Sequence, residues 1–263
     1  MNYSSNKVTT SPSPAVNNSV MNECVAIIPA RLAATRLPDK PLALILGKPM
    51  IQHVYERAMQ ARFIGQVLVA TPDEQIALAV RAFGGEVVMT LPSHRTGTDR
   101  IAEAAQSLPP EVRVIVNVQG DEPLLDPRTI DAIANPLLAD SSLSMSSLMC
   151  PLPQGRESDP NVVKVVCALN GNALYFSRSP LPFRRVESTA YAPRQHVGLY
   201  AYQRDFLARY PTLPPTPLEQ TESLEQLRAL EHGYTIRMVE TDRAPESVDT
   251  PDDLERVRAL FAV

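Results

Sequence analysis

The chain of 263 residues is poor in aromatic side chains and contains no tryptophan. Aromatic residues make up 5% of it, and 29 acidic residues outnumber 25 basic ones, so neither base stacking nor a broad positive field is available to a nucleic acid. The apolar runs, such as VIVNV, are far shorter than the roughly 20 residues that cross a bilayer. The sequence therefore argues against a nucleic-acid partner and against a membrane span. Any anionic ligand must be bound by a few local side chains.

Cysteine is also scarce, and phosphate-binding glycine motifs are missing. The three cysteines, Cys24, Cys150 and Cys167, show no CxxC or metal-ligand spacing, which favours reduced thiols and a cytoplasmic protein. Neither GxGxxG nor a Walker A loop occurs. Residues 1–20 are rich in Ser, Asn, Thr and Pro and lack the apolar segment of a secretory signal. We expect a disordered extension over 1–20 and a single domain over 21–263.

Short β-rich runs alternate with helix-like stretches in the first third of the chain, as in βαβ units on a parallel sheet. Later β-rich runs indicate a mixed extension of that sheet. The run 112–118 is almost wholly apolar, which is typical of a central strand covered on both faces. The strands are expected at 24–30, 66–71, 86–90, 112–118, 162–169, 173–180 and 196–203, with helices at 50–61 and 73–84 and a loop at 151–161.

Three Thr-Pro-x-acid motifs predict helix starts, with a threonine N-cap, a proline at the first helical position and a carboxylate reaching back. They begin at Thr71, Thr216 and Thr250. After Thr216, leucines at 218, 224, 227 and 230 predict one long amphipathic helix that ends near Gly233.

A basic loop follows the first apolar strand and carries Arg31, Arg36 and Lys40, with prolines at 29, 38 and 41. In open α/β sheets, ligands bind beyond the carboxyl ends of the strands, where this loop lies. The three cations could converge on a polyphosphate. A solvated basic loop is the competing interpretation.

Two acidic positions are candidates for a metal site. Asp121 and Glu122 follow the buried strand 112–118 directly after Gly120, which permits a close approach of the backbone. Asp249 precedes Thr250, which is expected to cap the helix, so Asp249 is not needed as a cap. One or two carboxylates, with substrate and water, usually hold Mg²⁺. Alternatively, Asp121 caps a turn and Asp249 is merely solvated.

Further polar residues lie on later segments. Arg178 ends an apolar strand and could bind a carboxylate through two hydrogen bonds, and His196 and Tyr200 share a strand face because their spacing is even. Glu225 and Gln226 lie in the leucine-striped helix. Their spacing alone favours the solvent-facing side of that helix over a sugar contact.

The motifs IIPARLAATRLPDKPL, HRTGTDRIAEA, VNVQGDEP, NVVKVV, ALYFSRSPLP, HVGLYAY, PLEQTESLEQLR and VDTPDDLERVR together closely resemble the 3-deoxy-manno-octulosonate (Kdo) cytidylyltransferases, or CMP-Kdo synthetases. The resemblance covers about residues 24–260 in order. It implies a Rossmann-like nucleotide-diphospho-sugar transferase fold, in which helices flank a mixed, mainly parallel sheet with a small dimerisation and sugar-binding extension. It also implies a cytoplasmic, Mg²⁺-dependent homodimer that converts CTP and Kdo into CMP-Kdo and pyrophosphate for lipopolysaccharide biosynthesis.

The resemblance also assigns roles to individual residues. The nucleotide site is expected to comprise Arg31, Arg36, Lys40, Thr71, Thr96, Gly97, Thr98 and Arg100. The metal ligands are expected to be Asp121 and Asp249, which with Arg31 and Lys40 form the catalytic set. The Kdo pocket is expected to be lined by Gln119, Arg178, His196, Tyr200, Glu225 and Gln226.

The chemistry expected of these residues is mainly positioning and charge neutralisation while the sugar hydroxyl attacks the α-phosphate. One alternative is a cytidylyltransferase for a related acid sugar, such as 8-amino-Kdo or sialic acid. Another is a regulatory protein that binds CTP without catalysis. A nucleic-acid-binding module fits the composition least well.

Overall fold

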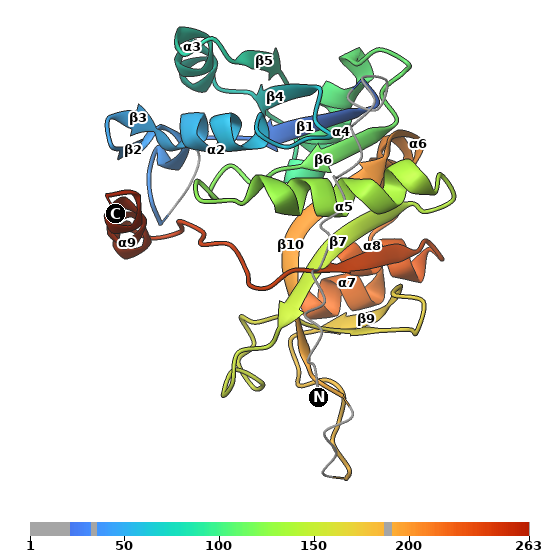
Figure 1. The fold of residues 1–263 in the computed structure, drawn as a ribbon. Helices are drawn as coiled ribbons and strands as arrows, with labels where there is room; N and C mark the ends of the chain where they lie inside the picture. Colours follow the sequence, from blue (N-terminus) through green and yellow to red (C-terminus); the bar gives the residue numbers. More distant parts are fainter. Residues whose placement is uncertain (1–21, 33–35, 187–190, 263) are drawn as a thin grey trace, which may run out of the picture.

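The computed structural model describes residues 22–32, 36–186 and 191–262. Its centre is a twisted sheet in the order β11-β7-β10-β6-β1-β4-β5, with β8 paired to β10 and β9 paired to β8 (Figure 1). The strands are β1 (Cys24–Pro29), β4 (Gln66–Thr71), β5 (Glu86–Met89), β6 (Val114–Asn117), β7 (Met145–Pro151), β8 (Lys164–Cys167), β9 (Ala173–Ser177), β10 (Arg194–Gln203) and β11 (Ile236–Glu240). A separate small hairpin joins β2 (Leu44–Ile45) to β3 (Lys48–Pro49).

The expected mixed, mainly parallel sheet is confirmed along this path. β1 pairs in parallel with β4 and β6, β4 with β5, and β7 with β11. β10 is antiparallel to both β6 and β7. β8 and β9 form an antiparallel extension beside the start of β10. A role of β8 and β9 in dimerisation or sugar binding stays a prediction, and so does the assignment of a single domain to 21–263. The disordered segment expected at 1–20 lies outside the described residues.

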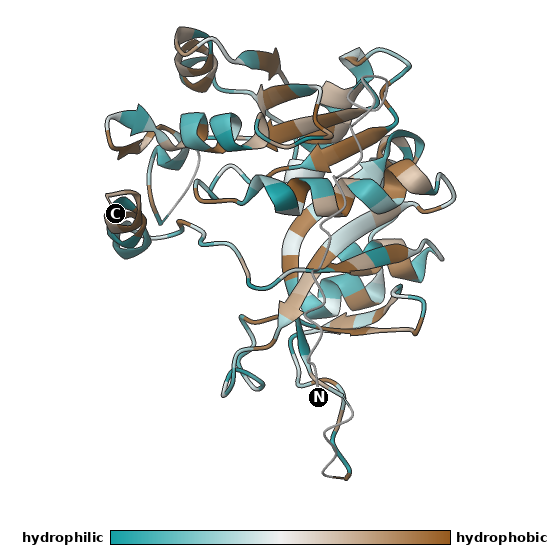
Figure 2. Cartoon of the chain, in the orientation of Figure 1, coloured by the Kyte–Doolittle hydropathy of each residue, from teal (hydrophilic) through white to brown (hydrophobic). Residues whose placement is uncertain are grey.

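Helices cover both faces of the sheet. The side chains of β1 alternate between two apolar clusters, one on each face, and each apolar face must be covered. Ala26 and Ile28 pack with α2, α3 and α5, whereas Val25 and Ile27 pack with α4, α6 and α8. The central strands β1, β4 and β6 are mainly in hydrophobic colours, while the helices show both kinds (Figure 2). The helices are α2 (Met50–Ala58), α3 (Glu74–Ala82), α4 (Gly97–Ala104), α5 (Pro127–Ala139), α6 (Arg204–Arg209), α7 (Pro217–Glu222), α8 (Gln226–Glu231) and α9 (Pro251–Phe261).

Among the residues described, no helix is both long enough and apolar enough to pass through a lipid bilayer.

A third, smaller apolar cluster fixes the C-terminal helix α9 beside the first part of the chain. Val248 and Leu254 pack there with Ile45 and Met50. The guanidinium of Arg258 donates to the carbonyl of Leu44 at 2.6 and 2.9 Å. This packing brings the segment before α9 next to the loop that follows β1.

Two of the three expected helix starts are confirmed, because Thr216 and Thr250 begin α7 and α9. The capping box is complete at Thr250, where the hydroxyl accepts the Asp253 N–H and the Asp253 carboxylate accepts the Thr250 N–H. At Thr216 the backbone N–H donates to the Glu219 carboxylate at 3.2 Å.

The prediction for Thr71 is wrong, because β4 continues through Thr71, which pairs with Met89. The helix α3 therefore begins after Asp73, and the Thr71 hydroxyl accepts a hydrogen bond from the Asp73 N–H at 3.1 Å.

The expected single leucine-striped helix is also wrong, because the chain breaks it into α7 and α8. Ser223 has a left-handed backbone with φ 52°. The carbonyls of Glu222 and Ser223 at the break accept hydrogen bonds from the Arg178 guanidinium at 2.7 and 3.3 Å. Helix periodicity could not reveal a break that a side chain following β9 stabilises. Gly233 does follow the end of α8, with φ 81°, as expected.

Candidate active site

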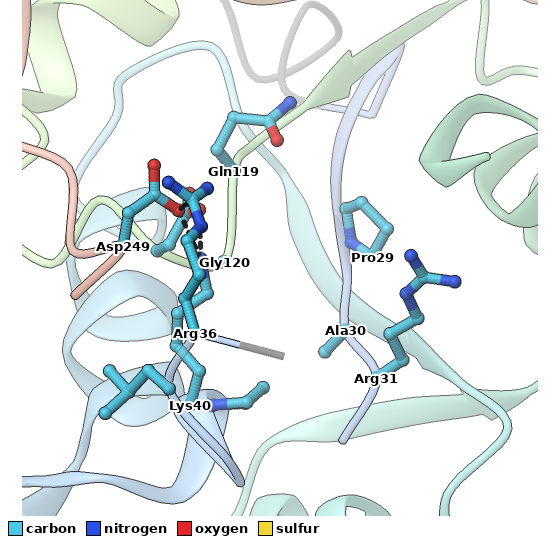
Figure 3. Close-up of a pocket in the computed structure, with 11 residues that line it drawn as sticks. Pro29, Ala30, Arg31, Arg36, Lys40, Gln119, Gly120 and Asp249 are labelled. Atoms are coloured by element: carbon cyan, nitrogen blue, oxygen red, sulfur yellow. Dashed lines mark hydrogen bonds and ion pairs between the residues drawn. The ribbon is translucent and has the colours of Figure 1, made fainter. Parts of the chain in front are cut away.

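A cleft opens beyond the carboxyl ends of β1 and β6, in two adjoining parts. The first has a volume of about 300 Å³ and is lined by the loop after β1, the turn after β6 and Asp249 (Figure 3). The second, of about 150 Å³, lies against the start of α4. Pro29, Ala30, Arg31 and Gln119 line both parts, so the two form one continuous site. Its place at the strand ends agrees with the rule for ligand sites in open α/β sheets.

The three cations of the basic loop all line the first part of the cleft, but from different sides. Arg36 and Lys40 lie beside Asp249, and Arg31 lies across the cleft from them (Figure 3). Arg36 pairs with Asp249 at 3.2 Å, whereas Arg31 is exposed and has no ion pair to any residue that the structure describes. The loop is thus an organised cationic rim of the cleft rather than a merely solvated one.

The two candidate metal ligands meet at one point, although they are far apart in the sequence. The Lys40 Nζ donates to Asp121 Oδ2 at 2.6 Å and to Asp249 Oδ1 at 3.1 Å. The backbone joins the same two segments, because the Val248 N–H donates to the Asp121 carbonyl at 2.9 Å. Burial opposes the charge of Lys40, but the charges and hydrogen bonds of Asp121 and Asp249 outweigh it and raise the pKa of Lys40.

The competing interpretations of the two aspartates are not supported. The Asp121 carboxylate faces Lys40 rather than capping its own turn. Thr250 caps α9, as expected, and the Asp249 carboxylate is left to contact Lys40 and Arg36.

Gly120 allows the turn after β6 to approach β1 closely, as expected. A Cβ atom at this position would lie 3.3 Å from the carbonyl oxygen of Pro29. The Glu122 carboxyl, two residues after Gly120, is buried. Burial, together with the charge of Asp121, raises the pKa of Glu122 to about 8. Asp121, in contrast, lines the cleft.

The donor set suits a magnesium ion held partly by substrate. No group of three or more His, Cys, Asp and Glu side chains is gathered for a metal within residues 22–32, 36–186 and 191–262. Two converging carboxylates beside a cationic cleft are nevertheless what Mg²⁺ usually takes from a protein, since phosphate and water oxygens complete its octahedron. Asp121 and Asp249 thus fit the ion, and their role as ligands stays a prediction.

The second part of the cleft contains most of the other residues expected to bind nucleotide. Thr96 caps α4 through a capping box, and it lines the cleft together with Gly97. Arg100 also lines this part, but its buried guanidinium donates to the Thr90 hydroxyl at 2.6 Å. Thr98 is buried behind the wall of the cleft. Thr71 is fully buried at the end of β4 and lines neither part.

Of the residues expected in the sugar pocket, Gln119 lines the cleft itself, whereas Glu225 lies behind Thr98. The Thr98 side chain interacts with both Glu225 and Tyr202. Burial raises the pKa of Tyr200, and the nearby charge of Glu225 adds to this effect. The two expected halves of the site, for nucleotide and for sugar, are therefore contiguous.

Glu225 and Gln226 do not lie on a solvent-facing helix side, so that interpretation was wrong. Gln226 is 4% exposed, and burial raises the pKa of Glu225. Within the described residues, Glu225 Oε1, Gln226 Nε2 and the Asn117 Oδ1 have no hydrogen-bond partner. Buried polar atoms are rarely left unpaired, so these atoms are suited to a hydroxyl-bearing ligand.

The rings of His196 and Tyr200, which were expected on one face of a strand, lie with their centroids 5.6 Å apart. The register of β10 against β7 shifts between Val197 and Tyr200, so this contact does not come from a regular strand. The Nε2 of His196 is 2.9 Å from the Ser147 hydroxyl, and burial lowers the pKa of His196 to about 3. His196 is therefore neutral at physiological pH.

Arg178 is placed away from the cleft and makes structural contacts. Its guanidinium donates to the carbonyls of Pro160, Glu222 and Ser223, rather than to a carboxylate through two hydrogen bonds. Its backbone N–H donates to the Glu222 carboxylate at 2.9 Å. Arg178 thus stabilises the junction of α7 and α8, which carries Glu225 and Gln226.

Sequence reasoning missed Asp73 and Tyr202. The Asp73 carboxylate accepts the Leu32 N–H at 2.8 Å and so fixes the start of the basic loop. Asp73 follows β4, whose carboxyl end lies beside that of β1, and this shared sheet edge was the available indication. Tyr202 was part of an expected strand, but only the tertiary structure places its phenol beside Thr98 of α4, Asn117 and Glu225.

Three comparisons with known proteins agree with one another. The family model described as "Cytidylyltransferase" matches residues 25–237. Curated proteins named 3-deoxy-manno-octulosonate cytidylyltransferase are 54% identical in Syntrophotalea carbinolica (89% of this chain, 96% of the relative) and 50% identical in Anaeromyxobacter dehalogenans (92% and 99%). A solved CMP:2-keto-3-deoxy-manno-octonic acid synthetase complexed with CTP is 44% identical, with a TM-score of 0.87 over 91% of this chain and 98% of the other.

Proposed function

Because the chain belongs to the cytidylyltransferase family, and because its full-length relatives are Kdo cytidylyltransferases, we infer that it transfers CMP from CTP to Kdo and releases pyrophosphate. The identity of 50–54% over nearly the whole of both chains is the observation that carries the choice of sugar. It favours Kdo over 8-amino-Kdo and sialic acid, and an enzyme over a regulatory CTP-binding protein.

The order of the substrates follows from the two parts of the cleft. The cytidine would lie against Thr96 and Gly97, and the triphosphate would extend past Arg31 toward Lys40. Kdo would approach past Gln119, and the unpaired buried atoms of Glu225 and Gln226 would bind its hydroxyls. In this proposed order the sugar would lie next to the α-phosphate.

The protein's part in the reaction is positioning and charge neutralisation. The anomeric hydroxyl of Kdo gives up its proton to solvent, and its oxygen forms a bond to the α-phosphorus while the bond from that phosphorus to the pyrophosphate oxygen breaks. Arg31, Arg36 and Lys40 offset the charge that builds up on the departing pyrophosphate. Asp121 and Asp249 would hold Mg²⁺, which when bound neutralises phosphate charge and lowers the pKa of a coordinated hydroxyl.

The remaining expectations are part of the same proposal. The buried or half-buried free cysteines support a reducing, cytoplasmic setting, in which the product would serve lipopolysaccharide biosynthesis. Leu174 on β9 is 63% exposed and Phe183 is 88% exposed, which supports a homodimer formed through the extension. Light scattering on the purified protein measures its oligomeric state.

The test of the function is an incubation with CTP, Mg²⁺ and each of three sugars, Kdo, 8-amino-Kdo and sialic acid, followed by mass detection of the nucleotide sugar. We expect CMP-Kdo to form fastest. The matched control is Asp121→Asn, which should retain the fold and lose turnover by about 100-fold or more. Tight CTP binding without product from any of the sugars would refute the enzymatic proposal.

A further inference from the structure

The Lys40 side chain holds an unusual place for a phosphate-binding lysine, because its ammonium lies between two carboxylates. It donates to Asp121 at 2.6 Å and to Asp249 at 3.1 Å, and its side chain is only 18% exposed. Arg36, the other cation at this point, contacts Asp249 alone and is 67% exposed. Lys40 is therefore the main counter-charge of the acidic pair.

Two carboxylates that converge on one point repel each other unless a cation lies between them. A divalent ion held by both would occupy the region that the Lys40 ammonium occupies, and the two cations would repel each other strongly. Lys40 and the metal therefore compete for the same oxygens. Lys40 also lines the cleft, so a phosphate group there offers its ammonium an alternative anionic partner.

We propose that Lys40 is the resident counter-cation of Asp121 and Asp249 and couples nucleotide binding to metal binding. A nucleotide phosphate draws the ammonium away from the carboxylates, and the freed carboxylates then accept the divalent ion. Lysine suits this task because its charge is compact and its four-carbon stem is flexible. The inference rests on the proposed function, since it takes the acidic pair as the metal site and the cleft as the triphosphate site.

The coupling has a consequence for the protein without nucleotide. If Lys40 competes with the metal, removing its charge must tighten metal binding when no nucleotide is present. A purely phosphate-binding lysine predicts no change in metal affinity. A lysine that only stabilises the local fold predicts weaker metal binding after its removal. The three roles therefore differ in the sign of one measured effect.

The experiment measures Mn²⁺ binding to the full chain by the electron paramagnetic resonance of free Mn²⁺, without nucleotide or sugar. The variants are Lys40→Met and, as a matched control, Lys48→Met. Lys48 pairs with Glu56 on the surface and does not line the cleft. We expect Lys40→Met to bind Mn²⁺ about tenfold more tightly than the wild type, within the usual range of coupling energies. Lys48→Met should match the wild type.

A second measurement follows CTP binding by calorimetry in excess EDTA. Lys40→Met should bind CTP about tenfold more weakly than the wild type, because the phosphate loses its charged partner. Circular dichroism checks that the variant is folded, and Lys40→Gln, which keeps a polar end without charge, carries the same expectations if the methionine variant is not.

Mn²⁺ affinity equal to or weaker than that of the wild type in a folded variant would overturn the coupling role. The proposed function would survive that result as long as the wild type still makes CMP-Kdo. Conversely, an inactive wild type with a tighter-binding Lys40→Met would leave the competition intact and reject the assigned reaction.

Discussion

Lowering the pH from 7 to 5 should destabilise this protein through His196. Burial lowers the pKa of His196 from 6.5 to about 3 in the folded state. Between these two values the unfolded chain binds a proton at this position and the folded chain does not, so the free energy of unfolding falls as the pH falls. At pH 5 the penalty amounts to about 2 kcal/mol, at 1.36 kcal/mol for each pH unit below 6.5.

This magnitude does not depend on the exact folded pKa. Any folded value well below 5 leaves the ring neutral at pH 5, so the pKa of the unfolded chain alone sets the penalty. The surroundings agree with a neutral ring, because the Ser147 hydroxyl is 2.9 Å from Nε2 and the Phe176 ring meets the imidazole edge-on at 4.9 Å. Among the described residues, no carboxylate offsets the effect of burial on the pKa of His196.

The assay is urea unfolding at pH 7 and pH 5, followed by circular dichroism, of the wild type, His196→Gln and His232→Gln. Other groups also titrate in this range, but they contribute to all three proteins alike. We expect the wild type and His232→Gln, whose changed residue is exposed, to lose about 2 kcal/mol more than His196→Gln on acidification. Equal losses in all three proteins would refute the buried, neutral state of His196.

Three further predictions concern the cleft rim, a shielded ion pair and a buried thiol. Arg31→Ala should weaken CTP binding about tenfold in calorimetry without lowering the melting temperature, because Arg31 is exposed and makes no ion pair to a described residue. Glu219→Gln should cost about 3 kcal/mol in urea unfolding, since it leaves the charge of Arg228, 12% exposed, unpaired while a glutamine can still accept the Thr216 N–H. Cys24 should react with a thiol reagent only after unfolding, because burial raises the pKa of its thiol.

Each of these has a clear contrary result. Arg31→Ala is compared with Arg81→Ala on the exposed side of α3, and equal CTP affinities would remove Arg31 from the nucleotide site. A loss below 1 kcal/mol in Glu219→Gln would mean that the pair with Arg228 is effectively solvated. Rapid labelling of Cys24 in the folded protein, identified by peptide mass, would contradict its burial.

Local sequence patterns were sufficient to predict those strands and helix starts that depend only on neighbouring residues. The apolar strands β1, β4 and β6 were predictable because both of their faces are buried. The starts of α7 and α9 were predictable because the Thr-Pro-x-acid motif is contained within four residues. The failures at Thr71 and Ser223 have a different origin. In both places a neighbouring strand decides the outcome, through the pairing of β4 with β5 at Thr71 and through the Arg178 guanidinium at Ser223.

The sequence by itself determined which residue types were available at the strand ends: a basic loop after β1, a glycine and an aspartate after β6, and an aspartate left free before α9. Only the tertiary structure decided that they meet. Lys40 is 81 positions from Asp121 and 209 from Asp249, and their contact depends on β1 pairing with β6 and on α9 packing against the β2 hairpin. Contacts over such separations follow from sheet order and core packing, which no local period in the sequence encodes.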